Sequence, residues 1–347
     1  MSLLRLALLL GLATQLFLST GRVYGFENSR YRSKRPAAGS RESPSIASLD
    51  ALNPDAVEKA GDRTVRPGDQ GAAVLRLQIL LDRANYSPGE IDGRYGKNLR
   101  NAIVAFQQKH SLKPDGAVGP AMWTALNSGA APALVSYTIS AEDVAGPFEP
   151  VPPDMQAQAK LAALNYESPL EGLAEKFHCS PRTLRALNPG RPFDAPGSAI
   201  VVPNIQSGPP QAAARIVVDA SDSSVTAFDA GGAVLARFPA STGSRHDPLP
   251  VGTWKIIGMK KMPPFHYNPN LFWDADEGDK KATIAPGPNN PVGVVWIALS
   301  KPHYGIHGTP APDRIGYAES HGCIRLTNWD ALKLAAMVKT GTPAILQ

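Results

Sequence analysis

Two short stretches, HYGIHGT (residues 303–309) and SHGCIRL (residues 320–326), decide how this chain is interpreted. Together they hold three histidines and one of the two cysteines in a chain of 347 residues. A lone cysteine between a glycine and an isoleucine can be half of a disulfide, a metal ligand or a nucleophile. The surrounding sequence must distinguish these three cases.

The other cysteine offers little support for a disulfide. Cys179 lies in KFHCSPRTLRALNP, at an apolar position directly before a predicted helix. A cysteine in such a position usually behaves as a small buried hydrophobic residue. Export would permit pairing with Cys323, but the two residues belong to different predicted modules. The sequence therefore favours two free thiols.

A zinc site is the second alternative, because His303 and His307 are spaced as in some zinc motifs. That spacing places two imidazoles together when the segment is helical. Pro302, Tyr304 and Gly305 favour a strand or loop instead, and on a strand the two residues would lie about 13 Å apart. A turn could bring the two histidines closer, so the sequence disfavours a zinc site but does not exclude one.

A nucleophilic thiol accounts for more of the motif. A free thiol, with a pKa near ~8.5, is mostly protonated at neutral pH, and a histidine within hydrogen-bond reach can take its proton. Gly322 leaves backbone N–H groups accessible to a developing oxyanion. The spacing alone does not say whether His307 or His321 is the base.

The sequence around these motifs predicts a mostly β domain over residues 213–347. Short runs of alternating apolar and polar residues are separated by Asp-Ser-Ser and Gly-Gly turns, as in RIVVDASDSSVTAFDAGGAVLARF. One convincing helix is predicted over residues 328–338. A long aromatic and Pro/Gly-rich stretch, Met262 to Pro291, is predicted to be either a lid or a packed loop, with His266, Tyr267, Phe272 and Trp273 as candidate lining residues.

At these residues the chain resembles the L,D-transpeptidase catalytic domain of the YkuD family. The matching segments are Ile306–Thr309, Ser320–Leu326, Ser241-Thr242-Gly243, Pro250 with Gly252, Asn290-Pro291 and Gly341-Thr342-Pro343. The resemblance implies that Cys323 is the nucleophile and His307 the base, oriented by the carbonyl of Gly308 or a neighbour. It assigns Ser320, His321, Gly322 and Gly308 to the oxyanion site and its support, and Arg325 and Tyr304 to substrate binding, although Arg325 could instead hold the loop. It implies neither a metal nor a cofactor.

The reaction that this resemblance implies is an acyl transfer on peptidoglycan. Cys323 would attack the meso-diaminopimelate carbonyl of a tetrapeptide stem and release D-alanine. The acyl group would pass to another stem in a 3→3 cross-link, to an envelope protein, or to water, which would make the enzyme an L,D-carboxypeptidase. Sensitivity to carbapenems would follow. A wall-binding protein without catalytic activity is the alternative from another class.

Residues 63–129 are predicted to form a separate helical module. Val74, Leu77 and Leu81 recur at helical spacing, and a third helix is predicted to open at Gly119-Pro120 and end near Leu126. This stretch resembles the peptidoglycan-binding type 1 domain, in its GDxG start, its IDGRYG turn, its AIVAFQ helix and its DGAVGPAMW ending. Phe106 and Trp123 are expected to be core residues.

Residues 135–205 are predicted to form a small unit in the order strand, helix, helix, strand. With Leu187-Asn188-Pro189 after the second helix, the unit resembles a LysM module, which binds polymers of N-acetylglucosamine. It departs from that family because about 25 residues separate the first strand from the first helix, where a LysM module has only a few.

The N-terminal residues predict export. Residues 1–25 contain Arg5, an apolar run from Leu6 to about Leu18 and a small-residue cleavage site after Gly25, as in a secretory signal peptide. Residues 26–62 are predicted to be a flexible basic linker, with no pattern for nucleic-acid binding. The expected product is a multidomain α+β protein in the periplasm, associated with the cell wall and without a membrane span.

Overall fold

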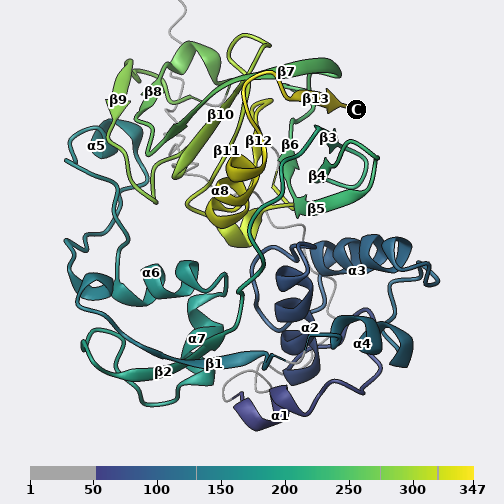
Figure 1. The fold of residues 1–347 in the computed structure, drawn as a ribbon. Helices are drawn as coiled ribbons and strands as arrows, with labels where there is room; N and C mark the ends of the chain where they lie inside the picture. The colour runs from purple at the N-terminus through teal and green to yellow at the C-terminus, as the bar shows by residue number, and fades with distance from the viewer. Residues whose placement is uncertain (1–51, 130, 274, 319) are drawn as a thin grey trace, which may run out of the picture. The chain divides into compact units, whose positions relative to one another are not determined.

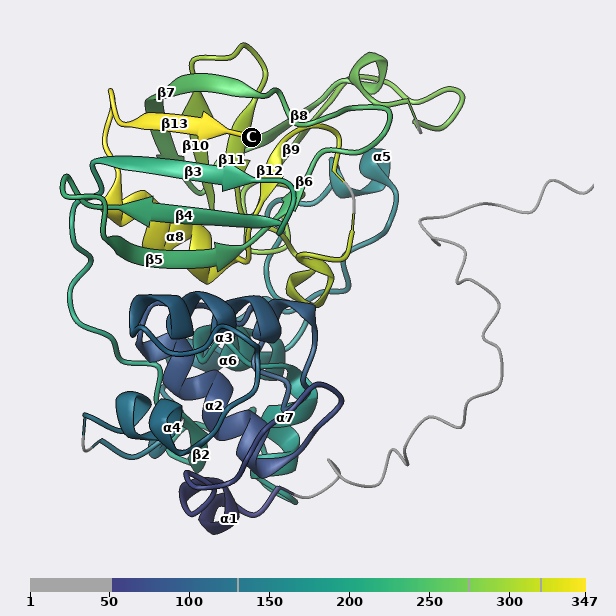
Figure 2. The same ribbon diagram turned by 90° about the vertical axis from the view of Figure 1, so that its right-hand side faces the viewer.

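A nine-stranded mixed sheet forms the centre of the C-terminal region in the computed structural model, which describes residues 52–129, 131–273, 275–318 and 320–347 (Figures 1 and 2). The strand order is β5-β4-β3-β13-β7-β10-β11-β12-β6. The strands are β3 (Arg215–Asp219), β4 (Ser224–Phe228), β5 (Val234–Pro239), β6 (Ser241–Thr242), β7 (Gly252–Lys261), β10 (Val295–Leu299), β11 (Gly305–His307), β12 (Ile324–Arg325) and β13 (Pro343–Leu346).

Alternation along these strands buries one face of the sheet, as the sequence predicts. In β3, Ile216 and Val218 are fully buried while their neighbours are partly exposed. Helix α8 (Asn328–Met337) packs against β10 and β11 and contributes Leu334 to the same core. Thr327 caps this helix by accepting a hydrogen bond from the Asp330 backbone N–H. The predicted fold class, helical binding region plus mostly β catalytic domain, is confirmed.

Three helices, α2 (Ala72–Arg83), α3 (Lys97–Lys109) and α4 (Pro120–Leu126), lie where the helical spacing predicts them. Val74, Leu77 and Leu81 are buried in their shared core. Phe106 and Trp123 are buried there too, and the Trp123 indole donates a hydrogen bond to the Arg63 carbonyl at 2.6 Å. Both aromatic residues are therefore core residues, as expected.

The next segment has the predicted order of strand, helix, helix and strand. Strands β1 (Leu134–Thr138) and β2 (Ala199–Pro203) pair antiparallel, and α6 (Pro169–Lys176) and α7 (Pro181–Leu187) pack on them. Ser168 and Ser180 cap the two helices through their side-chain oxygens. The assignment of this unit to the LysM family stays a prediction.

The predicted linker ends earlier than residue 62. Helix α1 (Pro54–Glu58) buries Val57 against the strand-helix-helix-strand unit, and Leu52 is buried in the same cluster. The Glu58 carboxylate accepts hydrogen bonds from the Arg76 side chain at 2.8 Å and from the Leu134 backbone at 2.6 Å. The prediction of a flexible linker is therefore wrong for residues 52–62, because a short helix with only one or two apolar positions has no detectable periodicity. The predicted signal peptide lies outside the described residues.

The 30-residue segment between β1 and α6 (139–168) forms an arm that crosses to the catalytic region. It contains a short 3-10 helix, η2 (Glu142–Val144), and helix α5 (Met155–Gln158). Its Leu164 packs with Tyr267 and Ile284 of the hairpin formed by β8 (Phe265–Tyr267) and β9 (Ala282–Ile284). We call the segment 265–284 the flap. It also contains η3 (Pro269–Leu271), and η4 (Pro312–Arg314) follows β11.

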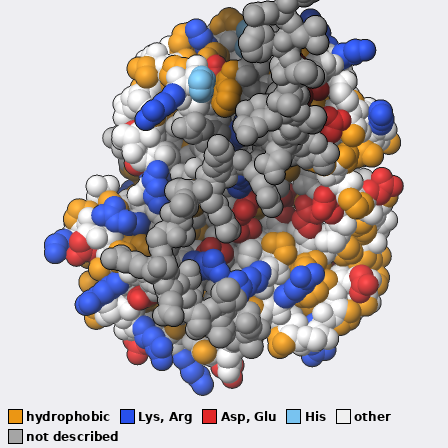
Figure 3. All heavy atoms as spheres, turned by 180° about the vertical axis from the view of Figure 1, so that it is seen from behind, with side chains coloured by type: hydrophobic (Ala, Val, Ile, Leu, Met, Phe, Trp, Pro, Cys, Tyr) orange, Lys and Arg blue, Asp and Glu red, His pale blue; other side chains and the backbone are white. Residues whose placement is uncertain are grey.

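The surface carries charges of both signs. On the face shown in Figure 3, Asp and Glu side chains gather across the middle, and Lys and Arg side chains lie mainly below and around them. Within the described residues no helix is long and apolar enough to cross a membrane.

Candidate active site

Strands β11 and β12 bring the two histidine-containing motifs together. They pair in parallel, with Ile306 opposite Ile324 and His307 opposite Arg325. Both isoleucines are fully buried in the sheet core. Because side chains alternate along a strand, His307 and Arg325 project from the opposite face, and Cys323 lies directly before β12.

His307 is held in one orientation. Its side chain is 3% exposed, its Nδ1 lies 2.7 Å from the Gly308 carbonyl oxygen, and the Trp296 ring stacks on it with centroids 5.4 Å apart. Because a carbonyl only accepts, Nδ1 is the protonated nitrogen, and Nε2 is left as an acceptor. Burial, aided by the positive charge of Arg325, lowers the pKa of His307 to about 3. The imidazole is therefore neutral at neutral pH.

The Cys323 thiol is also uncharged at rest. Its Sγ donates a weak hydrogen bond to the His303 carbonyl oxygen at 3.7 Å. Burial raises the pKa of the thiol, and a hydrogen bond from the Gly305 backbone and the charge of Arg325 oppose this only in part. The sequence predicts an imidazole within hydrogen-bond reach of the sulfur; the resting sulfur instead contacts a main-chain oxygen. The thiol of Cys323 and the imidazole of His307 are thus both uncharged at rest.

The turn before the thiol is built by Ser320 and Gly322. Ser320 Oγ accepts a hydrogen bond from the Gly243 N–H at 2.7 Å and donates one to the Cys323 carbonyl at 2.6 Å. Gly322 has φ +89°, and a Cβ there would lie 2.7 Å from the Tyr304 ring. Only glycine fits this position, and Tyr304 shapes the turn from outside.

His321 and Arg325 lie under the flap. The His321 ring is 4.9 Å from the Phe272 ring and 5.8 Å from the Trp273 ring, centroid to centroid. Arg325 Nη2 lies 3.4 Å from His321 Nδ1, a long contact. The Trp273 side chain is 58% exposed and stacks on His246. Of the predicted lining residues, Phe272 and Trp273 reach the motif, whereas Tyr267 is buried in the hairpin cluster and His266 bonds Thr283.

Two residues of the site are not predicted by any motif in the sequence. Trp296, on β10, packs over both Gly305 and His307. The Asn328 side chain accepts a hydrogen bond from the Val294 N–H at 3.1 Å and donates one to the Glu175 carboxylate at 3.0 Å. It also lies so close to Gly308 that a Cβ at that position would clash with it. The only signal for Asn328 is its position at the first turn of a helix directly after the cysteine motif.

The structure also bears on whether Cys323 forms a disulfide or binds a metal. Cys179 and Cys323 are both free, and Cys179 is buried, as its apolar position predicts. The His303 side chain is exposed and its backbone has φ +69°. Among the residues that the structure describes, no group of three His, Cys, Asp or Glu side chains is arranged to hold a metal ion.

Comparison with known proteins agrees with this geometry. Residues 213–346 match the YkuD L,D-transpeptidase catalytic domain family, and residues 70–126 match a peptidoglycan binding domain. The L,D-transpeptidase YkuD of Bacillus licheniformis is 31% identical over 175 residues, which cover 50% of this chain and 90% of that protein. The Bacillus subtilis protein of the same name is 30% identical, with the same coverage of both chains.

A solved structure, the L,D-transpeptidase of Xylanimonas cellulosilytica, is 18% identical with a TM-score of 0.36, covering 82% of this chain and 98% of the other. The identity and coverage of the Bacillus relatives show the family. The chain belongs to the L,D-transpeptidase family and is an L,D-transpeptidase that joins a YkuD catalytic domain to an N-terminal peptidoglycan-binding domain.

Proposed function

We propose that this enzyme uses Cys323 as nucleophile and His307 as base to cleave the meso-diaminopimelate–D-alanine bond of a tetrapeptide stem. The observation that supports the proposal is the parallel pairing of β11 with β12, which brings the segment of Cys323 alongside His307, whose Nδ1 contacts the Gly308 carbonyl and leaves Nε2 as an acceptor. A general base must be neutral to accept a proton, and the lowered pKa of His307 keeps it so.

The reaction then proceeds in two steps, acylation of Cys323 and transfer of the acyl group. Sγ of Cys323 attacks the diaminopimelate carbonyl while Nε2 of His307 takes the thiol proton. The backbone N–H groups of residues 321–323 stabilise the oxyanion, which the left-handed Gly322 leaves accessible. The imidazolium protonates the departing amine of D-alanine, and a thioester forms. An incoming amine loses its proton to His307, attacks the thioester, and releases Cys323 as a thiol.

Both matched domains act on peptidoglycan, so peptidoglycan is the partner and the protein is associated with the cell wall. We extend this to an exported, periplasmic enzyme whose acyl acceptor is another stem in a 3→3 cross-link. An envelope protein or water as acceptor would give protein anchoring or carboxypeptidase activity. The segment 135–205 would add affinity for glycan if it binds as a LysM module does.

Purified muropeptide tetrapeptides test the proposal, with products separated by mass. Wild type should yield cross-linked dimers and free D-alanine, while Cys323→Ala should yield neither and still bind sacculi. Cys179→Ala is the matched control, because it removes the other free thiol and should leave turnover intact. Tripeptides without dimers would identify a carboxypeptidase.

Two further measurements separate the other classes. Intact mass after incubation with a carbapenem should show one covalent adduct in wild type and in Cys179→Ala, and none in Cys323→Ala. Chelation should leave activity unchanged, whereas loss of activity that added zinc restores would identify a zinc hydrolase instead. Absence of any turnover in wild type would leave only a wall-binding protein and would overturn the proposal.

A further inference from the structure

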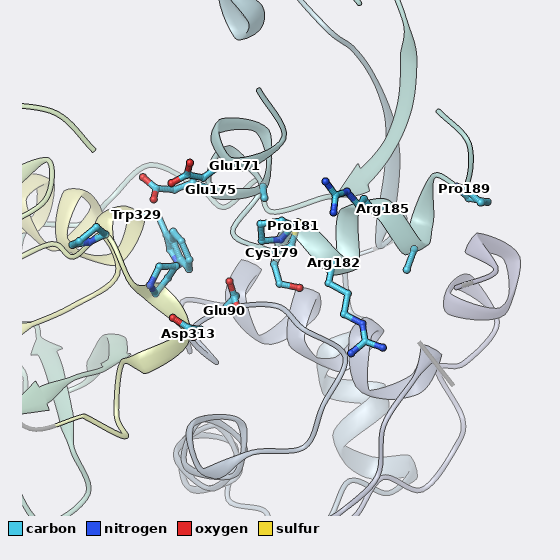
Figure 4. Close-up of a pocket in the computed structure, with 15 residues that line it drawn as sticks. Glu90, Glu171, Glu175, Cys179, Pro181, Arg182, Arg185, Pro189, Asp313 and Trp329 are labelled. Atoms are coloured by element: carbon cyan, nitrogen blue, oxygen red, sulfur yellow. The ribbon is translucent and has the colours of Figure 1, made fainter. Parts of the chain in front are cut away.

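A cavity of about 730 Å³ lies away from the catalytic residues, where three parts of the chain meet. We call it the junction pocket. Glu90 comes from the turn between α2 and α3, and Asp313 lies in η4, after β11. Helix α8 contributes Trp329, and α6 and α7 form the remaining wall (Figure 4). Pockets at the interface of domains are the usual place for ligand sites.

One end of the junction pocket carries two acidic side chains, Glu90 and Asp313. Within the described residues, the side chains of Glu90 and Asp313 have neither a hydrogen bond nor an ion pair, although they come from different modules and face the same space (Figure 4). Burial, with repulsion from Asp313 and Asp92, raises the pKa of Glu90 to about 8. A cation placed there would stabilise both carboxylates.

The other end of the junction pocket is basic. Arg182 and Arg185 project from α7 at a distance from Glu90 and Asp313 (Figure 4). Arg185 has no carboxylate partner among the described residues. The pocket therefore has Arg185 at one end and the acidic side chains of Glu90 and Asp313 at the other, and these residues do not pair with one another.

Trp329 forms an aromatic wall beside the acidic end of the pocket (Figure 4). Trp329 is 7% exposed and lines the pocket, and His178 stacks on it with centroids 5.1 Å apart. Its Nε1 is buried and has no hydrogen-bond partner in the described part of the chain. A buried donor without a partner is unfavourable, and a ligand bearing an acceptor could supply the missing hydrogen bond after a small movement of the ring.

We propose that the junction pocket binds a zwitterionic amino acid, with an ammonium group at the Glu90 end and a carboxylate at the Arg185 end. A diamino dicarboxylic acid can supply both groups, because each end of its aliphatic chain carries an ammonium and a carboxylate, and the end beside Glu90 and Asp313 would also contact Trp329. The identification with the diaminopimelate of a second, non-reacting peptidoglycan stem rests on the proposed function. The charge pattern of the pocket does not.

Three compounds of related skeleton test the charge pattern: meso-diaminopimelate, cadaverine, which lacks its carboxylates, and pimelate, which lacks its amines. The readout is the 19F resonance of Trp329 in the full chain with 5-fluorotryptophan, assigned through Trp329→Phe. Trp273, close to His321, reports on the catalytic cleft in the same spectrum. Diaminopimelate, free or in the stem tripeptide, should shift Trp329 saturably, and the other two compounds should bind at least tenfold more weakly.

Substitutions in the pocket test whether the shift of the Trp329 resonance reports binding there. Glu90→Gln combined with Asp313→Asn, and separately Arg185→Gln, should each weaken diaminopimelate binding at least tenfold. Glu142→Gln, an exposed carboxylate on the arm, is the matched control and should leave it unchanged. The inference is wrong if Trp329 does not shift, if only Trp273 shifts, if cadaverine binds as well as diaminopimelate, or if the pocket variants bind normally. Turnover of tetrapeptide, measured on the same samples, decides the proposed function separately.

Discussion

The Leu164 side chain tests whether the arm holds the flap in place. Leu164 is 0% exposed and packs with Tyr267 and Ile284, and these three are the buried residues of a small cluster in the described part of the chain. Its backbone is tied to the segment after the flap, donating to the Pro286 carbonyl at 3.0 Å and accepting from the Asn289 N–H at 2.9 Å. Leu164→Ala removes the central side chain of this cluster and leaves the backbone contacts possible.

The size of the effect follows from the burial. Replacing a fully buried leucine by alanine costs about 2–5 kcal/mol. The Leu164 cluster is small and separate from the sheet core, so the loss should fall on local opening of the flap rather than on global unfolding. A loss of about 2.8 kcal/mol corresponds to roughly 100-fold more of the open state.

Hydrogen exchange of the hairpin amides in β8 and β9 measures this opening. In Leu164→Ala these amides should exchange about 100-fold faster, while amides in β3 and β13 keep their rates. Leu271→Ala is the control, because Leu271 lies on the flap itself but is 54% exposed. Unchanged hairpin exchange in Leu164→Ala, or an equal change in Leu271→Ala, would refute the claim that the arm supports the flap.

Two further substitutions probe the contacts behind the site. Burial and nearby Asp82 raise the pKa of Asp330 to about 7, so the folded state holds this proton more tightly, and stability is lost as pH rises from 3.8 through 7. Asp330→Asn should therefore abolish a loss of about 3 kcal/mol between pH 5 and 8, measured by urea unfolding; an identical pH dependence in both proteins would contradict this. A Cβ at Gly308 would lie 2.1 Å from Asn328 Oδ1, so Gly308→Ala should displace His307 and lower kcat at least tenfold, whereas Gly258→Ala, with open space around it, should not.

Local patterns in the sequence predict the elements but not the contacts between distant segments. The spacing of Val74, Leu77 and Leu81 suffices to place a helix, and all three residues are buried. The paired motifs predict that His307 and Cys323 belong to one site. Neither pattern contains the register that brings Trp296 onto His307, because that contact depends on antiparallel pairing between β10 and β11.

The arm shows the same limit more clearly. Residues 139–168 have no sustained apolar period, so the sequence predicts only an insertion into a small module. Its structural role depends on Leu164 meeting residues 286–289, more than a hundred positions along the chain. At Gly287 a Cβ would lie 2.0 Å from the Leu164 carbonyl oxygen. The glycine is visible in the sequence, but the approaching backbone that requires it is not.

The pH dependence of turnover follows from the protonation states of His307 and Cys323. Burial disfavours both the thiolate and the imidazolium, and Arg325 further disfavours the imidazolium while favouring the thiolate. In the proposed mechanism, charge therefore develops only as Sγ attacks, and Arg325 is placed to stabilise the anion formed then.

Because the pKa of His307 is about 3, the acid limb of kcat/KM should lie well below the usual histidine range. An ordinary midpoint near ~6.5 would mean that burial does not lower the pKa of His307 and would refute this account of the site. Stability falls in the same region, since the unfolded state binds the His307 proton more readily as pH drops below about 6.5. Initial rates after brief acidification, checked by recovery of full activity on return to neutral pH, separate the catalytic limb from unfolding.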